Sequence, residues 1–316
     1  MTGTLRVVQP GMLTTIQDRG RWGLQARGVP VAGPMDPRSH RMANALVGNG
    51  LDAATLEVTL IGPELEFADE RVVAVTGAAF QMTLDGRPAP HATPFMASAG
   101  ARLRFGSRMG GARAYIGIAG GIAVEPTLGS RATHLISRMG GLGGRQLKAG
   151  DHLPLGEWRG NKPLADRTFA AAAPLPAGHA TIRVLAGPQA DYFAADALAA
   201  LQSAPYVIGT KSDRMGFRLE GPPLQHARGA DIISDATPLG ALQVPASGQP
   251  ILLMADRQTT GGYPKIATVI SADISVAGQL SPGDTIAFAV CSPREALAAL
   301  IAQEQTLMGI EAHAAS

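Results

Sequence analysis

The segment DRQTTGGYPK, from Asp256 to Lys265, gathers an acid, a guanidinium, an amide, two hydroxyls, a phenol and an amine. Asp256 follows the apolar run PILLMA, which predicts a strand that holds its carboxylate as a general base or as the orienting partner of a cation. Lys265 is one of four lysines in the chain, and its charge would stabilise a developing oxyanion. The alternative is that TTGGYP only turns the chain between two strands.

Neutral hydrogen-bond donors lie between these two charges. Gln258 offers an amide, two threonines offer hydroxyls, and a glycine pair leaves backbone N–H groups without side-chain hindrance. This combination suits a small carboxylate or a polarised carbonyl. We therefore predict Asp256, Gln258 and Lys265 as catalytic residues. The predicted substrate-binding residues of the segment are Thr259, Thr260, Gly261, Gly262 and Tyr263.

Three further polar segments contain residues of similar kinds. TTIQDRGRWG places Gln17 and Asp18 after a β-prone run. GTKSDRMGFRLEG places Arg214 before a glycine, and GALQVPASGQP contains Gln243. Each segment alone is equally well explained by a solvated loop. Together they predict one polar cleft between two halves of the chain, with these four residues as further substrate-binding groups.

Several familiar site patterns are missing from the sequence. It has no G-x-x-x-x-G-K-[ST], no G-x-G-x-x-G after a strand and no G-x-S-x-G. The seven histidines show no H-x-H or H-E-x-x-H spacing, so we predict no metal site. The glycine-rich patches GSRMGGAR and SRMGGLGGR are either turns or anion-binding nests. The one cysteine, Cys291, is better explained as a small buried hydrophobe than as a nucleophile.

The composition is that of a globular protein without a dominant electrostatic partner. The 316 residues are 46% hydrophobic and 16% charged, and the net charge is +2. Arginines are dispersed singly, which argues against a nucleic-acid partner. The N-terminus lacks the pattern of a secretory leader, and no run is long enough to cross a bilayer. The expectation is a cytoplasmic protein with no membrane partner.

Short β-prone runs separated by Gly and Pro recur along the chain, as in a sandwich or barrel protein. Asp85-Gly86 predicts a tight hairpin turn. Helices are expected at only three places. The first begins after an Asp36 cap and ends at Gly48-Asn49, the second covers 193–201, and the third follows a capping box at Ser292–Glu295.

A weak internal echo predicts two related halves. TLRVVQPGM resembles TIRVLAGPQ, and RQLKAGDHLPL resembles GQLSPGDTIAF. Between them, a segment rich in Ala, Pro and charge is typical of a linker. We predict an N-terminal half over 1–175 with the linker at about 157–180. A C-terminal half over 176–293 and a helix or tail over 294–316 follow, and the halves could exchange strands.

The motifs together resemble a known family. PGMLTTIQDRGRWGLQARGVPVAGPMD, LEVTLIGPEL, GARAYIGIAGGI, SDRMGFRLEGP and GALQVPASGQPILLMADRQTTGGYPKIATVISAD occur in order between about residues 4 and 290. They closely resemble the family called carboxyltransferase domain subdomain A/B, or allophanate hydrolase subunit 2. The resemblance implies two cyclophilin-like β-barrel domains with a few peripheral helices.

The resemblance implies a component of a hydrolase as the leading function. In that setting the chain is the C subunit of an ATP-dependent 5-oxoprolinase, which opens the 5-oxoproline lactam to L-glutamate together with the A and B subunits. One alternative is a biotin-dependent carboxyltransferase that takes carboxybiotin from a separate carrier to urea. Another is a non-catalytic regulator that binds a kinase-inhibitor-like protein related to the B subunit. Either enzyme acts on a small, planar, amide-like substrate.

Overall fold

The computed structural model describes residues 3–158, 160 and 174–315 and divides into two compact units. Unit 1 comprises Met1–Arg21, Ala32–Leu175 and Gln305–Ser316, and unit 2 comprises Trp22–Val31 and Pro176–Glu304. The main-chain division therefore falls between Leu175 and Pro176, and each unit also includes a segment from elsewhere in the sequence. Residues 159 and 161–173 of the predicted linker lie outside the described residues.

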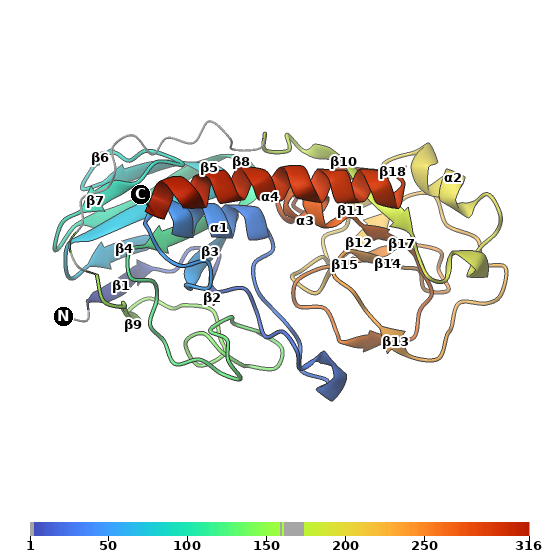
Figure 1. The fold of residues 1–316 in the computed structure, drawn as a ribbon, viewed down its shortest axis with the longest axis horizontal. Helices are drawn as coiled ribbons and strands as arrows, with labels where there is room; N and C mark the ends of the chain where they lie inside the picture. Colours follow the sequence, from blue (N-terminus) through green and yellow to red (C-terminus); the bar gives the residue numbers. More distant parts are fainter. Residues whose placement is uncertain (1–2, 159, 161–173, 316) are drawn as a thin grey trace. The chain divides into compact units, whose positions relative to one another are not determined.

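Unit 1 is built on one nine-stranded sheet (Figure 1). Its main path runs β2-β3-β8-β4-β1-β9, and β5 pairs with β6, β7 and β8, always antiparallel. Asp85 and Gly86 have φ angles of 51° and 80°, as the predicted hairpin turn between β5 and β6 requires. The strands are β1 Thr4–Gln9, β2 Leu13–Gln17, β3 Thr55–Thr59, β4 Glu64–Phe67, β5 Arg71–Leu84, β6 Arg87–Pro88, β7 Phe95–Ala97, β8 Arg102–Ile118 and β9 His152–Pro154.

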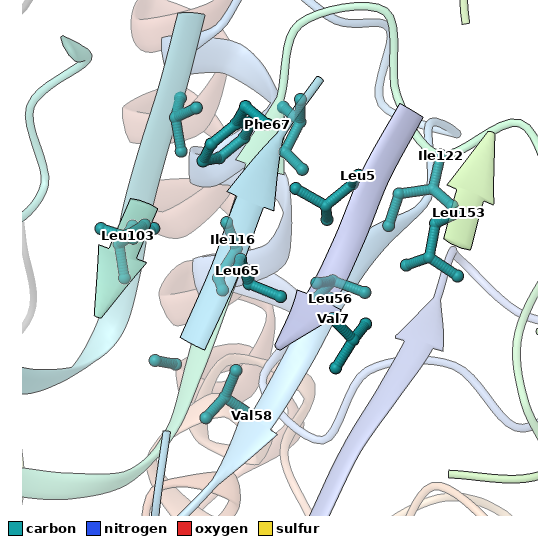
Figure 2. Close-up of a cluster of buried hydrophobic side chains, with 14 of the residues drawn as sticks. Leu5, Val7, Leu56, Val58, Leu65, Phe67, Leu103, Ile116, Ile122 and Leu153 are labelled. Atoms are coloured by element: carbon teal, nitrogen blue, oxygen red, sulfur yellow. The ribbon is translucent and has the colours of Figure 1, made fainter. Parts of the chain in front are cut away.

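The core of unit 1 comes from the buried face of this sheet (Figure 2). Alternate residues of β1 point inward, so Leu5 and Val7 are fully buried while Arg6 is exposed. Side chains from β3, β4 and β8 complete the cluster, including Leu56, Phe67 and Ile116. The glycine patch GSRMGGAR lies inside β8, so the expectation of a turn or an anion-binding nest there is wrong.

Helix α1, Pro37–Leu46, packs against β5 and β8. It begins as predicted: the Asp36 carboxylate accepts a hydrogen bond from Ser39 N at 2.9 Å, and Pro37 occupies the first turn. Met42 and Leu46, four residues apart, pack with Val72 and with Leu307 of the C-terminal helix. The 3-10 helix η1 covers Gln25–Arg27.

Unit 2 is built on a closed barrel in the order β10-β17-β14-β15-β12-β11-β18. Among these strands, only β10 and β18 pair in parallel. A separate two-stranded sheet joins β13 and β16. The strands are β10 His179–Ala186, β11 Tyr206–Ile208, β12 Gly216–Glu220, β13 Asp235–Ala236, β14 Ala241–Gln243, β15 Ile251–Leu253, β16 Thr260–Gly261, β17 Lys265–Val269 and β18 Thr285–Val290.

The remaining helices of the described part are peripheral to these strands. Helix α4, Pro293–Ala315, begins with the predicted capping box: Ser292 N donates to Glu295 Oε2 at 2.7 Å, and Glu295 N donates to Ser292 Oγ at 3.3 Å. The helix predicted at 193–201 begins later, because Phe193 forms a β-bridge with His226. The others are η2 Ala190–Tyr192, α2 Ala197–Ser203, η3 Ser271–Asp273 and α3 Ile274–Gly278.

The prediction of a mainly β protein with few helices is confirmed, with a closed barrel in unit 2 and a large antiparallel sheet in unit 1. No helix within the described residues combines the length and apolar character that crossing a bilayer requires.

Candidate functional site

The candidate site of unit 2 begins with a row of side chains on the outer face of the barrel. Phe217, Leu242 and Leu252 are buried and occupy paired positions on β12, β14 and β15, so this row faces the interior. Since side chains alternate along a strand, the next residues face outward. Arg218 pairs with Ile251, and Ile251 pairs with Gln243, which places a cation, an aliphatic group and an amide in one outward-facing row.

A cavity of about 190 Å³ lies over this row. Its walls combine apolar groups with amides, a phenol and charges. Gly216 pairs with Leu253 and adds no side chain, so the surface stays open beside Arg218. The lining residues are Lys211, Asp213, Met215, Gly216, Arg218, Gln243, Ile251, Leu253, Gln258 and Tyr263. Three of the predicted site residues, Gln243, Gln258 and Tyr263, are among them.

Two amide side chains are joined to each other at one wall of the cavity. Gln258 Nε2 donates to Gln243 Oε1 at 3.2 Å, and Gln243 Nε2 donates to the carbonyl of Tyr263 at 3.4 Å. Gly261 lies against this pair, because a Cβ added there would be 2.5 Å from Gln243 Nε2. The amides are thus held in place while keeping hydrogen-bonding capacity toward the cavity.

The TTGGYP segment does not simply connect two adjacent strands. β14 lies between β15 and β17 in the barrel, and Thr260–Gly261 pairs instead with Asp235–Ala236. Thr237 N donates to the carbonyl of Thr259 at 3.1 Å, and Ile232 N donates to that of Gly262 at 2.8 Å. The backbone of this segment therefore forms hydrogen bonds in and beside the small sheet. The lining of the cavity does not include Thr259, Thr260 or Gly262.

Lys265 is a buried cation with a dedicated partner. Its side chain is 1% exposed, and its Nζ lies 2.9 Å from Oδ2 of Asp235, which is half exposed. Gln189 Nε2 also donates to that carboxylate oxygen, at 3.3 Å. The hydrogen bond from Lys265 lowers the pKa of Asp235, and backbone N–H donation by Ala236 adds to this. The partner of the Lys265 amine is therefore a carboxylate that is itself accessible to solvent.

Asp256 and Arg214 form a buried, two-point ion pair. Arg214 Nε and Nη2 each lie 3.0 Å from a different oxygen of the Asp256 carboxylate. Asp256 follows β15 by three residues and lies in a turn, so the expected strand is shorter than PILLMA. Burial lowers the pKa of the adjacent Arg257 to about 10. With both oxygens bound to Arg214, the geometry of Asp256 favours the orienting role over the basic one.

The two predicted residues of the N-terminal half lie in unit 1, in its own hydrogen-bond network. Gln17 Nε2 donates to Thr15 Oγ1 at 3.0 Å and to the carbonyl of Thr133 at 3.1 Å. Asp18 accepts from Ser130 Oγ at 2.5 Å and from the backbone of Gly20 and Arg131. The role of both residues in substrate binding remains a prediction.

The prediction omitted Lys211 and Arg218, both exposed residues at the cavity. Their segment, GTKSDRMGFRLEG, was singled out for Arg214, whose side chain is buried in the ion pair with Asp256. The alternation of FRLE, in which Phe217 and Leu219 are buried, was the pattern that marks Arg218 as outward-facing.

Unit 1 has a second and larger hollow, of about 660 Å³, beside the glycine patch 140–144. Gly140, Gly141, Gly143 and Gly144 all have positive φ angles. A Cβ on Gly141 would meet Thr133 Oγ1 at 2.0 Å, which explains that glycine by close packing. Within the described part of the chain, no three His, Cys, Asp or Glu side chains are grouped as metal ligands.

The known proteins that this chain resembles are consistent with one another. A family model described as carboxyltransferase domain, subdomain A and B, matches residues 27–290. The C subunit of the 5-oxoprolinase of Escherichia coli strain K12 is 39% identical over 295 residues, which cover 93% of this chain and 94% of the relative. The urea amidolyase of Saccharomyces cerevisiae is 36% identical over 90% of this chain, which spans only 16% of that protein.

Solved structures show the same architecture. The Kluyveromyces lactis urea carboxylase matches with a TM-score of 0.89 and 34% identity over 98% of this chain, which covers 29% of that protein. The protein TTHA0988 matches with a TM-score of 0.83 and 39% identity, and this chain spans about half of it, 55%. The same module thus occurs in relatives of very different length.

Proposed function

Because this chain belongs to the carboxyltransferase domain, subdomain A and B, family, we propose that it is the C subunit of an ATP-dependent 5-oxoprolinase. Together with the A and B subunits, it opens the lactam of 5-oxoproline to L-glutamate. The observation that carries this proposal is the similarity to named relatives. The 5-oxoprolinase C subunits of E. coli and Haemophilus influenzae are 39% and 37% identical to this chain, and 94% and 89% of their lengths are matched, whereas the S. cerevisiae urea amidolyase is 36% identical.

The cavity of unit 2 supports a small amide-like substrate. A volume of about 190 Å³ is below the roughly 300–1,000 Å³ of pockets for drug-sized ligands. The paired amides of Gln243 and Gln258 offer both donors and acceptors, as an amide or lactam group requires. Ile251 and Leu253 provide an apolar wall for the carbon atoms of a small ring.

The charged residues beside the cavity have supporting roles in this proposal. Gln258 orients the lactam carbonyl, and Lys265 supplies positive charge when Asp235 moves aside. Asp256 holds Arg214 in one orientation, so the guanidinium is fixed rather than free to follow a ligand. Tyr263, which is 41% exposed, covers the cavity from its rim.

We assign this cavity to the amide substrate, because a small ring matches a space of about 190 Å³ lined by amide and aliphatic side chains. ATP is used by the proposed complex, and no step that we propose at this cavity involves the nucleotide.

Reconstitution tests the proposal. The chain is purified with the A and B proteins of the complex, and L-glutamate formation is measured with 5-oxoproline and ATP. We expect glutamate to form at a rate that falls to background when this chain is omitted. Equal glutamate formation without this chain, or none with all three proteins present, would reject the proposed function.

The second candidate is a carboxyltransferase component, which the match to the K. lactis urea carboxylase favours. In that case carboxybiotin on a separate carrier protein supplies the carboxyl group, and urea takes the place of the lactam. The amide pair of Gln243 and Gln258 suits urea as well, so the cavity fits both substrates. Transfer of labelled carboxyl from a carboxylated biotin carrier to urea, in the presence of this chain alone, would support this function against the first.

A further inference from the structure

The turn of one hairpin places two cations at the cavity of unit 2. β11 and β12 pair with Ile208 opposite Leu219, and Gly209 N donates to the carbonyl of Arg218 at 2.8 Å. Ser212 N donates back to the carbonyl of Gly209 at 3.1 Å, and this tight turn brings Lys211 to the same cavity as Arg218. The backbones of both residues are therefore fixed relative to the barrel wall.

Neither cation has a carboxylate partner in the part of the chain that the structure describes. Among those residues, no ion pair within 4.0 Å includes Lys211 or Arg218. The one acid in the lining, Asp213, turns Oδ1 toward its own backbone, where it accepts from Met215 N at 2.8 Å and Gly216 N at 3.4 Å. The lining thus contains two cations and one acid that is engaged locally, which leaves an excess of positive charge at the cavity.

The other cations of the same region are already neutralised. Arg214 is bound at two points by Asp256, and Lys265 is bound by Asp235. The sequence predicted Lys265 as the charge that stabilises an oxyanion and Arg214 as one of the substrate-binding residues. A buried cation that already has a partner gains less from a further anion than an unpaired cation at a cavity wall.

We propose that Lys211 and Arg218 form a subsite for the anionic group of the ligand, so that the cavity selects small carboxylates over neutral amides. The ligand lies with its amide at Gln243 and Gln258, its ring on Ile251 and Leu253, and its carboxylate at the two cations. The identification of that ligand as an anionic lactam rests on the proposed function, but the subsite itself rests on the cavity. It makes Lys211 and Arg218 the residues that distinguish 5-oxoproline from urea.

Direct binding to the full chain tests this subsite. 5-Oxoproline is compared with 2-pyrrolidinone, which has the same lactam ring without the carboxylate, by calorimetric or NMR titration up to millimolar concentration. We expect 2-pyrrolidinone to bind at least ~10-fold more weakly, because it forms no charge-assisted hydrogen bond. The affinity for 5-oxoproline should also fall as salt rises, since the cations are exposed.

Two variants with matched controls sharpen the test. Lys211→Met and Arg218→Met should each weaken 5-oxoproline binding by ~10-fold or more and leave 2-pyrrolidinone binding unchanged. Lys148→Met and Arg87→Met remove equally exposed cations of unit 1 and should change neither affinity. Equal binding of the two lactams, no binding of either, or 5-oxoproline affinity unchanged in both cavity variants would overturn the proposal.

The subsite and the proposed function fail in distinguishable ways. If the function is wrong and the subsite is right, the reconstituted complex forms no glutamate, yet the chain binds small carboxylates and loses this binding in Lys211→Met. If the function is right and the subsite is wrong, the complex forms glutamate and the KM for 5-oxoproline is the same in Lys211→Met, Arg218→Met and wild type.

Discussion

At the scale of single residues, Lys265 is the most informative side chain of the chain. An amine that is 1% exposed is costly to bury without a partner, and Asp235 supplies one at 2.9 Å. Asp235 belongs to the short strand β13, outside the barrel, while Lys265 begins the barrel strand β17. The buried charge is therefore held by a contact between the barrel and β13, and the lining of the cavity does not include it.

Replacing Lys265 tests its predicted part in the chemistry. In the reconstituted complex, Lys265→Met should lower kcat by ~100-fold or more, as loss of one oxyanion-stabilising donor does. Methionine keeps a similar length and an apolar stem, so circular dichroism and the thermal midpoint should show a folded chain. Lys148→Met, at an exposed position of unit 1, is the matched control. An unchanged kcat in a folded Lys265→Met variant would exclude this lysine from the chemical step.

His40 makes a separate prediction about pH and stability in unit 1. Burial lowers its pKa from 6.5 to about 4, although Asp18 and Glu57 oppose this effect, and its Nδ1 lies 2.9 Å from Thr55 Oγ1. Because the folded-state pKa is the lower one, the unfolded chain takes up a proton first as pH falls. The histidine therefore costs no stability above pH 6.5 and progressively more from pH 6.5 down to pH 4.

The expected size of this effect is about 3 kcal/mol of unfolding free energy between pH 7 and pH 4. It is measured as the difference between wild type and His40→Gln in urea unfolding across that range. The variant lacks the titrating group, so its free energy of unfolding should decrease less on acidification. Parallel pH dependences of the two proteins would contradict the assigned pKa.

The sequence predicted the kinds of residues at the site better than their partners. Gln243, at the end of β14, and Gln258 and Tyr263, on either side of β16, all line the cavity, and each was predicted from its own local segment. The pairings of Asp256 with Arg214 and of Lys265 with Asp235 join residues 42 and 30 positions apart. Such pairings depend on strand order in the barrel, which local patterns do not specify.

At the scale of elements, the position of β16 determines which backbone lies against the amide of Gln243. Thr260–Gly261 pairs with Asp235–Ala236 outside the barrel, and Gly261 passes close to the amide of Gln243. The pairing of β14 with β17 has a register shift at this point: Leu242 pairs with Ala267 and Gln243 pairs with Lys265, so the extra residue lies on β17. The two glycines of the TTGGYP segment therefore differ in their surroundings, because only Gly261 lies against the amide pair.

Alanine at each of these glycines tests the difference. A Cβ at Gly261 would be 2.5 Å from Gln243 Nε2, whereas the nearest atom to a Cβ at Gly262 is the Ile232 carbonyl at 3.6 Å. Gly261→Ala should displace the amide pair and raise the KM of the complex by ~10-fold, about the effect of one lost hydrogen bond to substrate. Gly262→Ala should leave the KM within about twofold. Equal effects of the two changes would show that the amide pair does not position substrate.

Local sequence patterns predicted helix caps and turns more reliably than the segments whose structure depends on long-range strand pairing. The Asp36 cap, the Asp85-Gly86 turn and the Ser292–Glu295 capping box are all present, because each depends on residues within a few positions. The expected start of the second helix was wrong, since the bridge between Phe193 and His226 is a long-range pairing. The glycine patch within β8 was misjudged for the same reason: β5 covers it as a paired strand.

At the scale of the whole molecule, the chain belongs to a family whose named relatives include 5-oxoprolinase C subunits and urea amidolyases. The module stands almost alone in the E. coli and H. influenzae relatives and is one part of larger proteins in the yeasts. The closed barrel of unit 2 supplies the amide-lined cavity, and the unpaired cations on the β11–β12 hairpin favour an anionic substrate. The amides suit both substrates, whereas the two cations agree better with 5-oxoproline than with urea.

The most direct test of the central claim is the substrate dependence of the reconstituted complex. This chain, with its A and B partner proteins, is incubated with ATP and either 5-oxoproline or urea, and ADP and L-glutamate are measured together. We predict ADP and glutamate formation in step with 5-oxoproline, no stimulation by urea, and loss of glutamate when this chain is left out. Stimulation by urea, or glutamate formation that does not need this chain, would contradict the account.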